Sequence, residues 1–132
     1  LDKLLQNINL KRQDVYITNI VKDRPPKNRD PQPKEIDIYA PLLIKQIKII
    51  KPQVIATLGR FSLNFLLNYI FKNDKYYPIS KLHGKTWQTP TSFGETTIFA
   101  LYHPAAALYN PNLRSTMEED FQKLSKIITQ NS

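Results

Sequence analysis

Short apolar runs typical of buried strands alternate along this chain with segments of helical periodicity, and this alternation limits its fold most strongly. Residues 15–21 and 53–59 are rich in valine, isoleucine and threonine and predict two such strands. Residues 96–103 predict a third strand, and a fourth is expected around Trp87. Around them, apolar residues recur at helical spacing in residues 2–10, 36–50, 60–71, 104–109 and from 112 onward. Strands that alternate with helices predict βαβ units around a small, mainly parallel sheet, the α/β class.

A stretch rich in proline and charge, residues 22–39, separates the first predicted strand from the first long helix. Its prolines lack a backbone N–H and bias the preceding residue towards extended geometry, so helix is excluded until about Glu35. Pro41 lies inside the helical pattern and should either kink that helix or mark its first turn. Loops of this length in compact domains are usually functional or disordered, which makes this one a candidate for function.

The composition of the chain narrows the kinds of partner it can have. Its 132 residues are the size of one domain, and its net charge of +8 favours polyanions such as nucleic acid. A coding bias towards lysine, asparagine and isoleucine would produce the same excess of charge. Without cysteine, disulfides and thiolate metal sites are excluded, and a cytoplasmic location fits. The apolar runs are shorter than the ~20 residues of a membrane span, so no membrane partner is expected.

Polar residues or glycine stand where each of the three main predicted strands ends. These are Asn19 in the first, Gly59 and Arg60 after the second, and His103 after the third. Ligands of open parallel sheets bind beyond the carboxyl ends of the strands, so these residues are candidates for one site. Helix caps produce the same pattern, which leaves the inference open from the spacing alone.

Four blocks of sequence occur in one order: VYITNIVKDRPPKNRDPQPKEI, VIATLGRFSLNFLL, ISKLHGK and ALYHPAAALYNP. In these blocks the chain resembles the iron–sulfur (family 4) uracil-DNA glycosylases, and the resemblance covers nearly all 132 residues. It implies a three-layer αβα sandwich around a small, mainly parallel sheet. It also implies a function in base excision repair, the hydrolysis of the N-glycosidic bond of uracil flipped out of DNA.

The resemblance implies roles for two residues at the base. Asn19 would read uracil, because its amide NH2 can donate to O4 while its carbonyl accepts from N3–H. His103 would be catalytic, because a neutral imidazole N–H aimed at O2 stabilises the charge that develops on the departing base. The alternative for Asn19 is an amide that only caps its strand.

The resemblance also suggests which residues grip the DNA. Gly59 would allow close approach of a phosphate, and Arg60 opens a helix whose N-terminus favours anions. Pro104 and Ala105 would press into the minor groove, with Leu108 or Tyr109 as a wedge. The complete set of expected DNA contacts is Arg24, Gly59, Arg60, Lys81, His83, Gly84, Lys85, Pro104, Ala105 and Leu108. For His83 the alternative is a structural hydrogen bond, and for Arg24 a solvated loop.

Two positions that the resemblance assigns to ligands of a [4Fe–4S] cluster hold Asp23 and Tyr39 in this chain. Neither a carboxylate nor a phenol substitutes well for a thiolate on such a cluster. No metal, cluster or other cofactor is therefore expected, and Tyr39 would fill part of the vacated volume.

The first motif of the family, a Gly-Glu-Ala-Pro-Gly-like loop that supplies a water-orienting acid, has no counterpart in residues 1–132. The strand before it would lie centrally in the sheet, between residues 15–21 and 53–58. We therefore expect one glycosylase-like domain, incomplete at its N-terminus and weak or inactive alone. A missing N-terminal segment or another chain would complete the sheet, since unpaired strand edges are avoided inside a sheet.

Two other interpretations differ in function. A non-catalytic, glycosylase-like module that binds DNA or a partner would explain the loss of the cluster positions, but the retention of Asn19 and His103 argues against it. A generic α/β nucleotide-binding domain is disfavoured because the chain contains neither GxGxxG nor GxxxxGK[ST].

Overall fold

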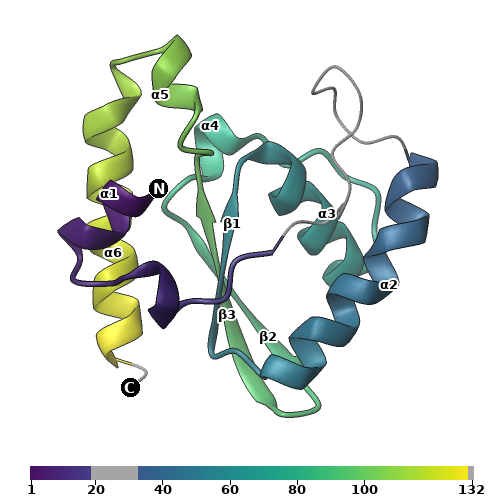
Figure 1. Cartoon of the computed structure of the whole chain (residues 1–132). Helices are drawn as coiled ribbons and strands as arrows, with labels where there is room; N and C mark the ends of the chain where they lie inside the picture. The colour runs from purple at the N-terminus through teal and green to yellow at the C-terminus, as the bar shows by residue number, and fades with distance from the viewer. Residues whose placement is uncertain (19–32, 131–132) are drawn as a thin grey trace.

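A computed structural model describes residues 1–18 and 33–130 of the chain. In this part the chain forms a three-stranded sheet between two layers of helices (Figure 1). Helices α1 (Asp2–Asn7) and α6 (Leu113–Gln130) lie on one side of the sheet, and α2 (Pro33–Ile50) and α3 (Arg60–Phe71) lie on the other. The expected α/β class and αβα layering are confirmed.

The sheet has the order β1-β3-β2, so the last strand in sequence lies in the middle. Strand β1 (Val54–Leu58) runs parallel to β3 (Gly94–Leu101), and β2 (Thr86–Thr91) runs antiparallel to it. The hairpin between β2 and β3 closes at the turn predicted around residues 92–94. Between the two parallel strands the chain passes through α3 and α4 (Ile79–Leu82) and then through β2, which returns it to β3.

The central strand β3 faces both hydrophobic cores because successive side chains of a strand point to opposite faces. Phe99 and Leu101 pack with α1 and α6, while Ile98 and Ala100 pack with α3. Every residue of β3 from Thr96 to Leu101 is buried. Burial on both faces fixes the register of β3 and therefore the position of the residues that follow it.

Most predicted helices form close to their expected bounds. Helix α3 spans residues 60–71 as predicted, and the short α5 (Ala106–Tyr109) lies in the helical segment expected at residues 104–109. Helix α2 begins at Pro33, slightly before Glu35, because proline fits the first turn of a helix. Pro41 lies inside α2 with an exposed side chain and not at its first turn.

The strand predicted at residues 15–21 is wrong in its described part. Residues 15–18 form no strand, and Tyr16 and Ile17 are 59% and 43% exposed. They follow a short 3-10 helix, Arg12–Asp14, and the described sheet holds no strand that pairs with them. A β-branched run forms a strand only where a neighbouring strand satisfies its backbone. Residues 19–21 of the predicted strand lie outside the described residues.

Across the described ranges, no helix combines the length and the apolar character that crossing a membrane requires.

Candidate functional site

The carboxyl ends of β1 and β3 meet at one edge of the sheet, and they bring Gly59 and His103 together. Leu58 pairs with Leu101, and the Gly59 N–H donates to the Leu101 carbonyl oxygen at 2.8 Å. A Cβ added to Gly59 would lie 3.1 Å from the Cβ of His103. Gly59 also has φ 93°, a conformation that favours glycine. Both the positive φ and the close approach of His103 therefore favour glycine at this strand end.

The imidazole of His103 is held by the backbone that follows it. The Ala105 N–H donates to Nδ1 of His103 at 3.1 Å, and the Ala106 N–H donates to the His103 carbonyl at 2.9 Å. A ring nitrogen that accepts a hydrogen bond carries no hydrogen, so the proton of the ring is on Nε2. His103 is exposed, and this tautomer gives it one N–H donor to offer to a ligand.

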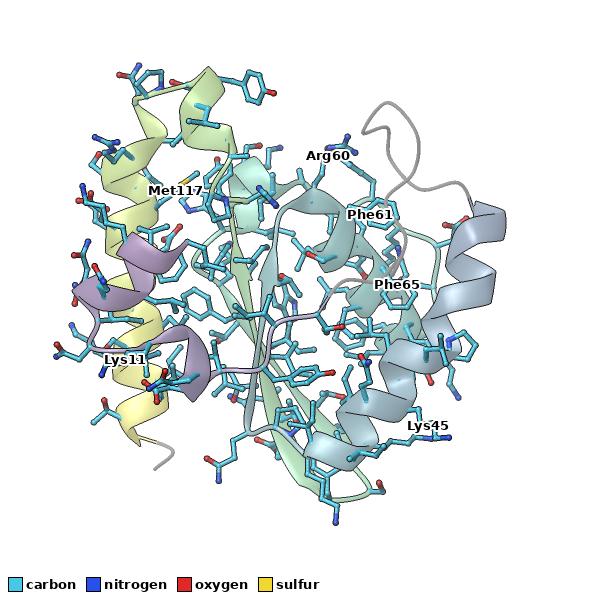
Figure 2. All side chains as sticks on the ribbon, in the orientation of Figure 1. Lys11, Lys45, Arg60, Phe61, Phe65 and Met117 are labelled. Atoms are coloured by element: carbon cyan, nitrogen blue, oxygen red, sulfur yellow. The ribbon has the colours of Figure 1, made fainter. Side chains whose placement is uncertain are left out.

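Helix α3 begins beside His103. Gly59 is its N-cap and has no side chain, and no side-chain hydrogen bond caps this end within the described residues. Ser62 instead donates back to the Leu58 carbonyl at 2.9 Å, which ties the first turn to the strand end. Arg60 is exposed and extends outward from the start of the helix (Figure 2). The arrangement places the N-terminus of α3 next to His103, with the positively charged Arg60 as its first residue.

The segment after His103 presents apolar side chains to solvent. Pro104 and Ala105 are half-buried, whereas Leu108 and Tyr109 at the end of α5 are 82% and 90% exposed. Exposure of two adjacent large side chains on a four-residue helix is not explained by packing. It suits a wedge that inserts into a partner.

A third segment, from the last turn of α4 to the start of β2, is tied to the same end of β3. The Gly84 N–H donates to the Ala100 carbonyl at 2.7 Å, and the Ala100 N–H donates to the Lys85 carbonyl at 3.1 Å. Lys81 and Lys85 are exposed, while His83 is partly buried. The structure therefore brings three of the predicted segments, Gly59–Arg60, Lys81–Lys85 and His103–Leu108, to one edge of the sheet.

His83 has a partner that the sequence analysis missed. Its Nδ1 lies 2.7 Å from Oδ2 of Asp120 in α6, and its ring packs at a tilt against that of Tyr102 with centroids 4.8 Å apart. The sequence carries a signal for Asp120, since Met117, Asp120, Phe121 and Leu124 share one face of α6. A carboxylate on the apolar face of an amphipathic helix is unusual unless it has a partner.

Several predicted site residues lie outside the described part of the chain. These are Asn19, Asp23 and Arg24. Tyr39 falls within α2, but its side chain is not described. The uracil-reading role of Asn19 and the DNA contact of Arg24 therefore stay predictions.

The donors of this chain do not fit the cluster of the family it resembles. Fe–S clusters are held by Cys thiolates, and the 132 residues contain no cysteine. In the described ranges, no group of three or more His, Cys, Asp or Glu side chains is arranged to hold a metal ion. We therefore assign no step of any reaction to a cluster.

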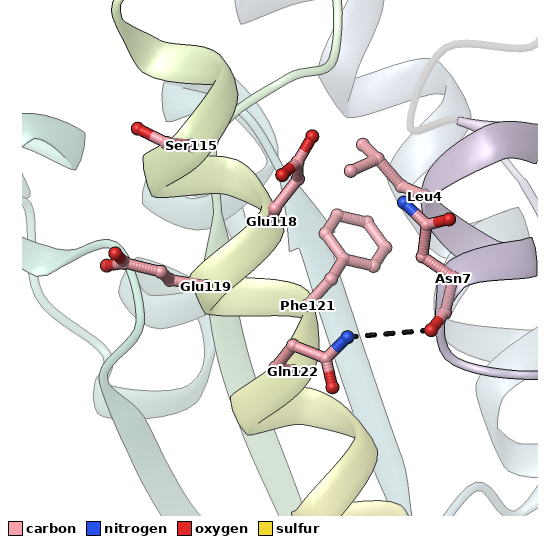
Figure 3. Close-up of a pocket in the computed structure, with 7 residues that line it drawn as sticks. All are labelled: Leu4, Asn7, Ser115, Glu118, Glu119, Phe121 and Gln122. Carbon is pink, nitrogen blue, oxygen red and sulfur yellow. Dashed lines mark hydrogen bonds between the residues drawn. The ribbon is translucent and has the colours of Figure 1, made fainter.

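A separate hollow of about 470 Å³ lies between α1 and α6 (Figure 3). Gln122 donates there to the Asn7 carbonyl at 3.5 Å. Its lining residues are Leu4, Asn7, Ser115, Glu118, Glu119, Phe121 and Gln122. Two glutamates repel phosphate, so this hollow is not part of the candidate site.

Comparison with known proteins identifies the family of the chain. A family model described as the uracil DNA glycosylase superfamily matches residues 1–126. The type-4 uracil-DNA glycosylase of Archaeoglobus fulgidus is 41% identical over 127 residues, which are 96% of this chain and 63% of that protein. The Sulfurisphaera tokodaii protein of the same description is 46% identical over 120 residues, 91% of this chain and 54% of the relative. The Saccharolobus solfataricus protein of the same description is 44% identical over 130 residues, which are 98% of this chain and 59% of that protein. The chain thus spans between 54% and 63% of the length of these relatives.

Proposed function

Because the chain belongs to the uracil DNA glycosylase superfamily, we propose that it forms the part of a uracil-DNA glycosylase that grips DNA and stabilises the departing base. The observation that carries this proposal is the junction of Gly59 and His103 at the ends of two parallel strands. It places an oriented N–H donor, an arginine and a helix N-terminus at one edge of the sheet.

In the proposed reaction, uracil is flipped out of the helix and the bond between its N1 and C1′ of deoxyribose breaks. The electron pair of this bond stays on the base, water adds to C1′, and the proton that the water loses passes through solvent to the released uracil. Nε2–H of His103 donates to O2, where the negative charge of the leaving base gathers. A donor held in advance by the Ala105 N–H needs no reorientation when the charge develops.

Recognition of the base is assigned to Asn19, whose amide would donate to O4 and accept from N3–H of uracil. Cytosine reverses both partners at this edge, so an amide in one fixed orientation separates the two bases. Asn19 lies outside the described residues, and the assignment rests on the match of the surrounding sequence block to the family.

Contacts with the DNA are assigned to the three segments at this end of the sheet, Gly59–Arg60, Lys81–Lys85 and His103–Leu108. Arg60 and the N-terminus of α3 would hold one phosphate, and Lys81 and Lys85 would hold another. Leu108 and Tyr109 would insert between bases, since they are the two most exposed large apolar side chains among the described residues. The net charge of +8 supports this polyanion partner.

We also propose that a further strand completes the sheet. Strand β1 pairs on one side with β3, and the described residues supply no strand for its other side. Ala56 in the middle of β1 is exposed, which is unusual for a strand of a three-layer sandwich. A strand from a longer parent chain or from another polypeptide would pair there and bring the water-orienting acid to the site.

A uracil-release assay tests the proposal. The full-length protein is incubated with DNA that contains one uracil, and abasic sites are revealed by strand scission in hot alkali. Scission is expected with uracil and not with thymine at the same position. Absence of scission, with DNA binding intact, would instead support a non-catalytic DNA-binding module.

A further inference from the structure

We propose that Asp120 is a positioning residue that holds His83 as a phosphate-binding cation in the DNA interface. The proposal rests on the function proposed above, and it adds a residue from α6 to a site otherwise built on loops at the strand ends. Asp120 would not touch the DNA. It would act through His83, which is 26% exposed while Asp120 is 2% exposed.

The contacts of His83 leave one edge of its ring for a ligand. Nδ1 lies 2.7 Å from the Asp120 carboxylate, and because a carboxylate only accepts, Nδ1 carries the hydrogen. The ring of Tyr102 packs against the imidazole in a tilted arrangement, with an angle of 30° between the two rings. The remaining edge carries Nε2, and Lys81 and Lys85, two positions to either side of His83 in the sequence, are exposed. An imidazole between a carboxylate and a phosphate donates from both nitrogens and so carries a positive charge.

Stability alone does not account for the buried carboxylate. Moving a charge out of water is costly, and a buried ion pair is often no more stabilising than apolar residues of the same volume. The neighbours of Asp120 on its helix face, Met117, Phe121 and Leu124, show that this face of α6 packs well with apolar side chains. An ionic group at this position is therefore better explained by what it does to His83.

The glycine at position 84 leaves space beside the loop backbone for the carboxylate of Asp120. Gly84 has φ 78°, and a Cβ there would lie 2.7 Å from Oδ1 of Asp120 and 3.4 Å from Nζ of Lys123. No side chain fits between this loop and Asp120. The Gly84 N–H donates to the carbonyl oxygen of Ala100 at 2.7 Å, so the loop cannot move away without breaking a hydrogen bond to β3. The contact with Asp120 and the hydrogen bond from Gly84 to β3 thus hold His83 at the end of the central strand.

The test measures binding of a fluorescein-labelled DNA duplex without uracil over a series of salt concentrations. The variants are His83→Gln, Asp120→Asn and the double variant, with Glu119→Gln as the control. Glu119 is exposed and adjacent in sequence to Asp120, and its substitution removes the same single negative charge. Loss of a negative charge alone should strengthen DNA binding in both Asp120→Asn and Glu119→Gln. The proposal predicts the opposite change for Asp120→Asn, which should bind DNA more weakly.

We expect Asp120→Asn and His83→Gln each to weaken binding about 3- to 10-fold and to lower the salt slope by about one, as for the loss of one phosphate contact. The double variant should bind no more weakly than either single variant, because both remove the same contact. Glu119→Gln should bind at least as tightly as the unchanged chain. An Asp120→Asn protein that remains folded by circular dichroism and binds as tightly as Glu119→Gln would overturn the proposal.

A second measurement does not depend on whether Asp120→Asn folds. In the unchanged chain, long-range proton–nitrogen spectra of the His83 ring are followed as DNA is added. Nε2 should shift on binding while Nδ1 keeps its hydrogen bond, and an unchanged Nε2 signal at saturation would overturn the proposal. Since the duplex holds no uracil, these outcomes are separate from any failure to release uracil.

Discussion

Gly59 and His103 lie at the ends of two neighbouring parallel strands, so close that a Cβ on Gly59 would stand 3.1 Å from that of His103. The register of β1 and β3 creates this proximity, because Leu58 pairs with Leu101. The buried central strand holds that register, and the Ala105 N–H then orients the imidazole. A rigid sheet therefore positions the proposed catalytic donor, although the donor itself lies in a loop.

Replacement of Gly59 tests this junction. Gly59→Ala should lower the free energy of unfolding by about 1–3 kcal/mol, because alanine is strained at positive φ, and it should also displace His103. Gly94→Ala is the matched control, since Gly94 has φ 117° but nothing within 4 Å of its added Cβ. Urea unfolding should show a loss for both variants, larger for Gly59→Ala because of its contact with His103, whereas uracil release should fall only for Gly59→Ala. Equal release by the two variants would show that the contact with His103 is unimportant.

The exposed tip of α5 should matter for DNA and not for folding. Leu108→Ala and Tyr109→Ala remove side chains that are 82% and 90% exposed, so the unfolding temperature should stay unchanged. Affinity for DNA should fall several-fold if either side chain is the wedge. Tyr76→Ala is the control, because Tyr76 is also a large exposed side chain, at 74%, in the loop between α3 and α4. A loss of affinity as large for Tyr76→Ala would contradict a specific role for α5.

The central strand should dominate stability. Phe99 is fully buried in the core beneath α1 and α6, and Phe99→Ala should lower the free energy of unfolding by about 3–5 kcal/mol. Ile49→Ala removes a side chain on α2 that is 70% exposed, and it should change the free energy of unfolding by less than about 0.5 kcal/mol. Denaturant midpoints of the two variants measure the difference. Similar midpoints would mean that β3 is not the centre of the fold.

Local patterns in the sequence were sufficient to predict an element whose structure depends on its own residues alone. Helix α3 could be predicted to the residue, because its apolar period begins directly after Gly59. The strand predicted at residues 15–21 failed in its described part, because a strand also depends on a partner that lies elsewhere. The sequence could place His83 in a basic loop. It could not assign Asp120 to it, since the two residues are 37 positions apart and meet only when α6 packs on the sheet.

The most direct measurement is the single-turnover rate of uracil release by the full-length protein and its His103→Ala variant. Removal of one preorganised donor typically costs about 3 kcal/mol, so the rate should fall about 10²- to 10³-fold. Binding of uracil-free DNA should stay nearly unchanged, because the proposed contacts with DNA come from residues other than His103. An undiminished rate in His103→Ala would contradict the central claim that the imidazole at the end of β3 stabilises the departing base.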